Sequence, residues 1–201
     1  MPTAGKLRSR STPGFSASQL QTADGVATVK DPATPKGNTM AQAVKPIPEG
    51  FTAVTPYLTV KGAAAAIDFY RKAFGAEETY RLNAPDGKIA HAEIRINGAV
   101  IMLHDETPEW KAFSPHTIGD TPCSLMLYVR DPDAVVKRAV DAGATLTMEV
   151  ADQFYGDRCG GIKDPFGHKW SIATHIEDVP HDEINRRAAK MFEQMAQQKK
   201  P

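Results

Sequence analysis

The sequence has few cysteines, no long apolar run and no excess of either charge. Only Cys123 and Cys159 occur among the 201 residues, which excludes a disulfide scaffold and a four-cysteine zinc site. We therefore expect a protein of the reducing cytoplasm. No apolar stretch approaches the ~20 residues that span a bilayer, so no membrane partner is expected. Lys plus Arg and Asp plus Glu number 24 each, and this balance gives no general attraction to nucleic acid.

The first 50 residues differ in composition from the rest of the chain. Residues 1–50 are rich in Ser, Thr, Pro, Gly and Ala and lack sustained apolar periodicity, which predicts disorder. They are either an organelle transit peptide or an extension upstream of a true start at Met40. Pro13 would interrupt the amphipathic helix of a transit peptide, so we prefer the second explanation. The folded part is expected to begin near Phe51.

From there, one series of secondary-structure elements occurs twice. The first series is AVTPYLTV, AAAAIDFYRKAFGA, ETYRLNA, KIAHAEIRI and AVIMLHD; the second is CSLMLYVRD, DPDAVVKRAVDAGA, ATLTMEVA, DRCGGIKD and HKWSIATHI. Each predicts a strand, a helix and three further strands. Val60 and Val129, like Gly98 and Gly167, are 69 positions apart. The sequence therefore predicts an α+β fold of two tandem βαβββ modules, at about residues 52–118 and 119–178 of a domain spanning 51–180.

A last helix is predicted after Pro180, within residues 181–201. Its apolar residues recur at helical spacing: Ile184, Ala188, Met191, Phe192 and Met195. Such a stripe packs on the core or on a second subunit.

The duplicated unit resembles a known superfamily. YLTVKGAAAAIDFYRKAFGA in one copy and GDRCGGIKDPFGHKWSIATHIEDV in the other are similar to the vicinal oxygen chelate superfamily, which includes glyoxalase I, bleomycin and fosfomycin resistance proteins and extradiol dioxygenases. The closing stretch looks most like its PhnB-like branch. The resemblance covers roughly residues 52–190 and implies curved mixed sheets around a cleft. It also implies that dimerisation, or pairing within one chain, completes the cleft, so we expect a homodimer.

In metal-dependent members of that superfamily, four cleft side chains hold the metal. Their positions fall here on Thr55, Met102, Ser124 and Ser171. None of these suits Zn, Ni, Fe or Mn, which bind imidazole, carboxylate or thiolate. The resemblance therefore implies that the usual metal site is lacking and that no cofactor is expected.

Alternation along each strand extends these four positions to a whole cleft surface. The expected ligand-binding residues are Thr55, Tyr57, Thr59, His91, Glu93, Met102, His104, Ser124, Met126, Tyr128 and Ser171. Tyr57 and Tyr128 would suit a planar aromatic ligand, or they would simply fill the cleft.

Three of these residues form a sharper candidate. If Asn97 and Gly98 make a two-residue hairpin turn, Glu93 pairs with Met102 and His91 with His104. The resulting imidazole and carboxylate cluster is a polar ligand-binding patch, a displaced metal site or a proton-transfer site. We favour the first and keep the others as alternatives.

Three further residues are expected to face away from the cleft. His168 and Trp170 of DPFGHKW should point to the helix side of the final strand, because Ser171 faces the cleft. Cys123 adjoins Ser124 and should likewise be buried on the helix side.

The function expected from these patterns is binding of a small molecule, in the manner of the glyoxalase and bleomycin resistance type. The protein would sequester a drug or metabolite. A ligand with an aromatic group would fit the expected cleft. The alternative is a lyase, isomerase or oxygenase acting through His91, Glu93 and His104. A structural or regulatory dimer is a third class.

Overall fold

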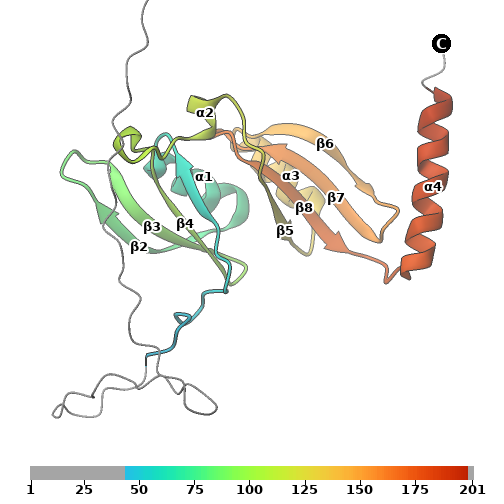
Figure 1. Cartoon of the computed structure of the whole chain (residues 1–201), viewed down its shortest axis with the longest axis horizontal. Coiled ribbons are helices and arrows are strands. Elements are labelled where there is room, and N and C mark those ends of the chain that lie inside the picture. The colour runs from blue at the N-terminus through green and yellow to red at the C-terminus, as the bar shows by residue number, and fades with distance from the viewer. Residues whose placement is uncertain (1–43, 199–201) are drawn as a thin grey trace, which may run out of the picture. The chain divides into compact units, whose positions relative to one another are not determined.

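The structure is a computed structural model that describes residues 44–198. Met40 and most of the predicted disordered extension, residues 1–43, lie outside the described residues. The elements follow the predicted order (Figure 1). They are β1 (Tyr57–Val60), α1 (Ala63–Phe74), β2 (Glu77–Asn83), β3 (Ile89–Ile96), β4 (Ala99–Asp105), η1 (Pro108–Trp110), α2 (Pro115–Ile118), β5 (Ser124–Tyr128), α3 (Pro132–Asp141), β6 (Thr145–Asp152), β7 (Asp157–Lys163), β8 (Lys169–His175) and α4 (His181–Gln198).

The two predicted modules are confirmed as two mixed sheets. Module 1 holds strands in the order β1-β4-β3-β2, and module 2 holds β5-β8-β7-β6. In each, the first strand runs parallel to the last and the other pairs are antiparallel. The repeat extends to register, because Tyr57 pairs with Met102 and Met126, 69 positions on, pairs with Ser171. Both sheets are open.

The hairpin between β3 and β4 has the predicted turn. Asn97 and Gly98 have φ angles of 47° and 84°. A two-residue type I′ turn requires positive φ at both of its central residues. Glu93 then pairs with Met102 and Arg95 with Val100. This fixes which side chains share each face of the sheet.

One helix covers one face of each sheet. Helix α1 buries Ala66, Ile67 and Tyr70 against the sheet of module 1, and α3 buries Val135, Val136 and Ala139. The helices also contact each other, so the modules share one core. We call the opposite, helix-free faces the open faces of module 1 and module 2.

A buried carboxylate ties the modules together. Asp164 is 3% exposed, and its Oδ2 accepts hydrogen bonds from the Tyr70 hydroxyl at 2.8 Å and from Trp170 Nε1 at 2.9 Å. Its Oδ1 accepts from the backbone N–H groups of Phe166 and His168, both at 2.9 Å. The DPFGHKW motif is therefore a joint between α1 of module 1 and β8 of module 2.

Boundaries differ from the sequence prediction at two strand starts. Strand β1 begins at Tyr57, so Thr55 precedes it, where its hydroxyl donates to the carbonyl oxygen of Thr52 at 3.0 Å. Cys123 precedes β5 and is exposed. The prediction that Cys123 is buried was wrong, because alternation applies only inside a strand.

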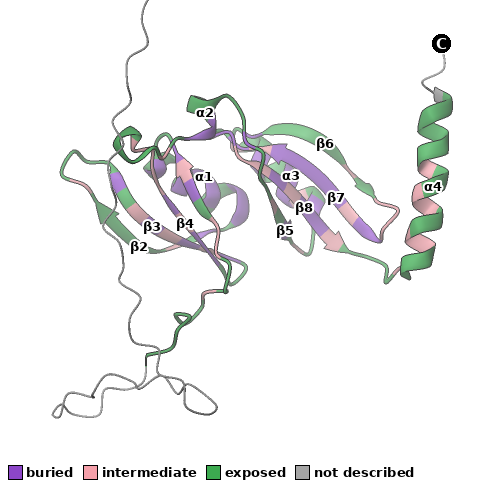
Figure 2. Cartoon of the chain, in the orientation of Figure 1, coloured by how far each residue is buried: buried purple, intermediate pink, exposed green. Residues whose placement is uncertain are grey.

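Helix α4 confirms the predicted C-terminal helix, but no residue from His181 to Gln197 is buried. Phe192 and Met195 are 60% and 52% exposed, and Figure 2 shows the helix largely exposed. Arg187 anchors its first turns, because its Nη1 and Nη2 each donate to the carboxylate of Glu177 at 2.8 Å. Among residues 44–198, no helix has the length and apolarity to cross a bilayer.

Candidate functional site

The predicted cleft residues of module 1 lie together on its open face. Tyr57 and Thr59 on β1 pair with Met102 and His104 on β4, and Glu93 on β3 pairs with Met102. Paired residues point to the same side of a sheet. Thr55 lies in the segment just before β1. The alternation in KIAHAEIRI places the apolar residues under α1, where Ala92, Ile94 and Ile96 are buried.

Tyr57 is at the centre of this group. Its ring makes edge contacts with His91 and His104, at centroid distances of 5.5 and 5.0 Å. Its hydroxyl hydrogen-bonds His91 Nδ1 at 2.9 Å. The side chain nevertheless remains 50% exposed, and partial burial raises the pKa of its hydroxyl. A half-exposed aromatic ring held by two imidazoles can offer flat apolar area in a fixed orientation.

In the neutral form of each imidazole, the hydrogen-bond partners determine which ring nitrogen carries the proton. His104 Nδ1 lies 2.8 Å from the carbonyl oxygen of Asp105 and must donate to it, so Nε2 accepts from the Thr59 hydroxyl at 3.0 Å. His91 Nε2 lies 3.4 Å from Glu93 Oε1 and donates to that carboxylate. Its Nδ1 then accepts from Tyr57. All four ring nitrogens have partners within the chain.

In this arrangement, hydroxyl groups already occupy one nitrogen of each imidazole. A metal would need the imidazole lone pairs that the hydroxyls of Tyr57 and Thr59 use. Among residues 44–198, no three His, Cys, Asp or Glu side chains converge as metal ligands would. At the superfamily's ligand positions, Met102 offers a thioether and Thr55 bonds to Thr52. Neither of these two side chains is the imidazole, carboxylate or thiolate that a Zn, Fe or Mn site uses.

The remaining predicted residues lie on the open face of module 2. Ser124, Met126 and Tyr128 on β5 pair with Lys169, Ser171 and Ala173 on β8. Met126 and Tyr128 are 51% and 54% exposed. Within the described chain, no hydrogen bond or ring contact joins this group to the group on module 1. The eleven residues therefore form two groups on separate sheets.

The module 2 face has no copy of the histidine cluster. Gly161 pairs with Ser171 and Cys159 with Ala173, so Gly161, Cys159 and Ala173 occupy the places of Glu93, His91 and His104, in that order. The turn between β7 and β8 is one residue longer than the turn at Asn97. Each residue of β7 therefore lies 68 positions after its counterpart in β3, whereas residues of β8 lie 69 positions after theirs in β4. Cys159 is 2% exposed, and burial raises the pKa of its thiol. The polar cluster is thus specific to module 1.

Two exposed side chains of module 1 were missed. Tyr80 and Leu82 on β2 pair with Glu93 and His91 and are each 50% exposed. The Tyr80 ring lies 5.9 Å from that of His91. The alternation of ETYRLNA could have identified them, since it places both on one side of the strand.

A second polar cluster at one end of module 2 was also missed. Asp157, 5% exposed, accepts hydrogen bonds from the Tyr128 hydroxyl and from His175 Nδ1, both at 2.8 Å. His175 Nε2 lies 3.0 Å from Asp178 Oδ1. Because both ring nitrogens face carboxylates, the protonated imidazole is favoured, and the hydrogen bonds to Asp157 and Asp178 raise the pKa of His175. The bond to Asp157 also raises the pKa of Tyr128.

His175 should make the stability of the fold depend on pH. Its pKa is raised in the folded chain, so its stabilisation is complete below the unfolded value of about 6.5. The stabilisation is lost as the pH rises through the higher folded value. Urea midpoints measured from pH 5.5 to 8.5 should therefore fall more steeply for the wild type than for His175→Gln. His181→Gln, a change on exposed α4, is the control and should follow the wild type; parallel curves for all three would contradict the prediction.

A small cavity adjoins the module 1 group. It measures about 280 Å³ and is lined by residues of β1 and α2 and by the segments before β5 and β8, among them Tyr57, Thr59, Cys123 and His168. His168 is half-buried, and its Nε2 donates to the carbonyl oxygen of Thr59 at 3.2 Å. Trp170 is buried, as predicted. His168 thus contacts module 1 and is not part of the cluster.

Comparison with known proteins supports the resemblance seen in the sequence. The profile of the Glyoxalase/Bleomycin resistance protein/Dioxygenase superfamily matches residues 51–172. The uncharacterized protein Rv0887c of Mycobacterium tuberculosis is 46% identical over 152 residues, which cover 74% of this chain and 86% of that protein. The solved structure of the At5g48480 product from Arabidopsis thaliana is 29% identical with a TM-score of 0.50, covering 61% of this chain and 98% of that one. PhnB-like proteins are also structural neighbours: the PhnB protein from Bacillus cereus is 18% identical with a TM-score of 0.48, covering 61% of this chain and 99% of that one.

Proposed function

Because the chain belongs to the glyoxalase/bleomycin resistance protein/dioxygenase superfamily, we propose that it is a small-molecule binding protein whose ligand lies on the open face of module 1. The observation that carries the proposal is the Tyr57 ring, half exposed and held between His91 and His104. Tyr80 and Leu82 extend the apolar surface beside it. The ligand class that fits is a planar, aromatic drug or metabolite with a polar edge for Glu93 and the imidazoles.

The proposal includes no bound metal, since the imidazole nitrogens are engaged by hydroxyl, carbonyl and carboxylate groups. Elemental analysis of the purified full chain tests this. One equivalent of a transition metal would contradict it.

The proposal also includes a homodimer in the cytoplasm. Support comes from the exposed apolar side chains on both open faces and on α4, including Met126, Tyr128 and Phe192. Such surfaces are usually covered by a partner. Sedimentation velocity at micromolar concentration distinguishes the dimer from a monomer.

The binding proposal predicts a large effect of Tyr57→Ala. In a thermal-shift screen of planar aromatic metabolites and antibiotics, compounds that stabilise the wild-type chain should bind Tyr57→Ala about tenfold more weakly or worse, because the central contact ring is lost. Met126→Ala removes an equally exposed side chain at the matching position of module 2 and should bind as the wild type does. Equal losses in both variants, or no stabilising compound, would contradict the placement.

An enzymatic role is the second candidate, and the chain of hydrogen bonds from Tyr57 through His91 to Glu93 favours it. Such a chain can move a proton between a ligand and a carboxylate, as a lyase or isomerase requires. Mass spectrometry of the bound compound decides between the two. Unchanged compound supports binding alone, whereas turnover that His91→Gln abolishes while affinity is kept supports catalysis.

A further inference from the structure

A second cavity lies where the two modules meet, apart from the histidine cluster. It measures about 750 Å³ and lies between the end of α1, the β3–β4 turn and the start of α3. Phe74, Val129 and Val135 give it an apolar floor, and Phe74 and Val135 are 8% and 6% exposed. Asn97 closes the module 1 side, where its Nδ2 donates to the carbonyl oxygen of Tyr128 at 3.0 Å.

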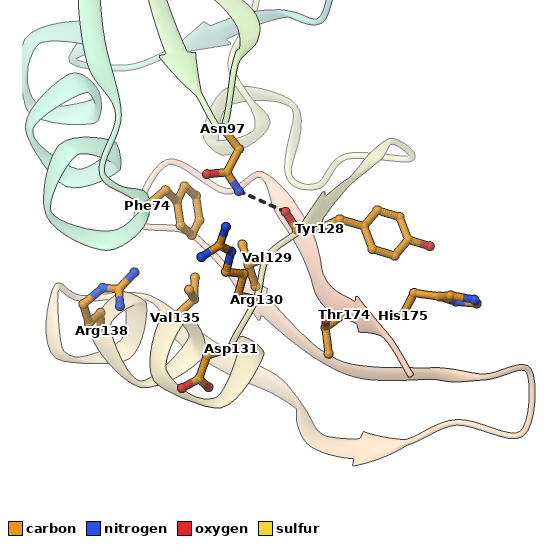
Figure 3. Close-up of a pocket in the computed structure, with 10 residues that line it drawn as sticks. All are labelled: Phe74, Asn97, Tyr128, Val129, Arg130, Asp131, Val135, Arg138, Thr174 and His175. Carbon is orange, nitrogen blue, oxygen red and sulfur yellow. Dashed lines mark hydrogen bonds between the residues drawn. The ribbon is translucent and has the colours of Figure 1, made fainter. Parts of the chain in front are cut away.

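Two arginines line this cavity without a partner of opposite charge. In the part of the chain that the structure describes, neither Arg130 nor Arg138 makes an ion pair or a side-chain hydrogen bond. Arg71, Arg81 and Arg158, by contrast, each bond to carboxylates. Figure 3 shows the guanidinium groups of Arg130 and Arg138 turned into the space beside Phe74 and Val135.

The other charged groups of the cavity do not neutralise both arginines. Asp131 carries one negative charge, and its Oδ1 accepts a hydrogen bond from the N–H of Ala134 at the start of α3, at 2.9 Å. His175 lies at the far end in Figure 3 and pairs with Asp157 and Asp178. The space between Arg130 and Arg138 therefore has an excess of positive charge above an apolar floor.

We propose that this cavity binds a small organic anion, with its carboxylate or phosphate group between Arg130 and Arg138 and its apolar body on Phe74 and Val135. A guanidinium group presents paired N–H donors that match the oxygens of such groups. Val129 and the accessible edges of Phe74 and Val135 supply apolar contact for the body of the ligand. This site is independent of the ligand site proposed on module 1.

Phenyl phosphate is the probe, titrated into the full chain and followed by calorimetry and by backbone amide NMR. Chemical shift changes should concentrate at Phe74, Asn97 and residues 129–138. Arg130→Gln and Arg138→Gln should each weaken binding about tenfold or more, since each removes charge-assisted hydrogen bonds. Lys137→Gln removes a positive charge from the same helix outside this cavity, where Lys137 pairs with Asp141, and should bind as the wild type does. Added salt should weaken binding.

Two neutral or smaller probes separate the contributions. Benzyl alcohol, which keeps the ring but not the charge, and inorganic phosphate, which keeps the charge but not the ring, should both bind more weakly than phenyl phosphate. The proposal is overturned by absence of binding at millimolar concentration, by equal affinity of Arg130→Gln, Arg138→Gln and Lys137→Gln, or by inorganic phosphate binding as tightly as phenyl phosphate. Loss of binding in Tyr57→Ala would assign the anion to the module 1 site instead.

Discussion

Asp164→Ala is expected to lower the free energy of unfolding by about 3–5 kcal/mol, because it leaves buried donors without an acceptor. Asp164 accepts four hydrogen bonds, two of them from the buried side chains of Tyr70 and Trp170. These donors belong to different modules, so the loss affects the joint between them. Urea denaturation followed by tryptophan fluorescence measures the change.

Two milder variants define the scale of that effect. Tyr70→Phe removes a single donor and should cost about 1 kcal/mol. Asp68→Ala removes a carboxylate of an exposed ion pair with Arg71 and should change the stability by less than ~1 kcal/mol. A result for Asp164→Ala no larger than that for Asp68→Ala would contradict the role of Asp164 as the joint.

The second large effect is expected at Gly156, in the turn between β6 and β7. Gly156 has a φ of +100°, and a Cβ there would lie 2.1 Å from the carbonyl oxygen of Glu177. The Gly156 carbonyl oxygen also accepts hydrogen bonds from the N–H groups of Ile176 and Glu177, at 2.9 and 3.0 Å. Gly156→Ala must displace the segment that leads to α4, so we expect a loss of about 3 kcal/mol or more.

Gly87→Ala is the matched control, since Gly87 holds the same place in module 1. Its φ is +84°, but nothing lies within 4 Å of a Cβ built there. This variant should show only the cost of a left-handed alanine, about 1–2 kcal/mol. Urea midpoints compare the two variants, and amide hydrogen exchange at Ile176 and Glu177 should quicken only in Gly156→Ala. Equal losses would show that the contact with Glu177 adds nothing.

The sequence was sufficient to predict features that depend on local rules. Asn97-Gly98 identified the hairpin because that turn needs two positive φ angles, and the register of Glu93 with Met102 followed from it. Alternation then placed His91, Glu93 and His104 on one face. These rules hold because each involves neighbours in the chain or across one hairpin.

Features that depend on distant contacts could not be predicted. Nothing in the sequence indicates that Asp164 would accept from Tyr70, 94 positions away. The cluster at Asp157 and His175 depends on the register of β7 with β8. That register differs from the one between β3 and β4, because the turn between β7 and β8 is one residue longer. Arg130 and Arg138 come together with Phe74 only because α1 and α3 pack against each other.

The contrast between the two thiols has a practical consequence for spectroscopy. Cys159 is buried, whereas Cys123 is exposed at the cavity that Tyr57 and Thr59 also line. A maleimide fluorophore will therefore modify Cys123 first in the folded chain, with no cysteine introduced or removed. The attached dye would then report in real time on any compound that binds at the site proposed beside Tyr57.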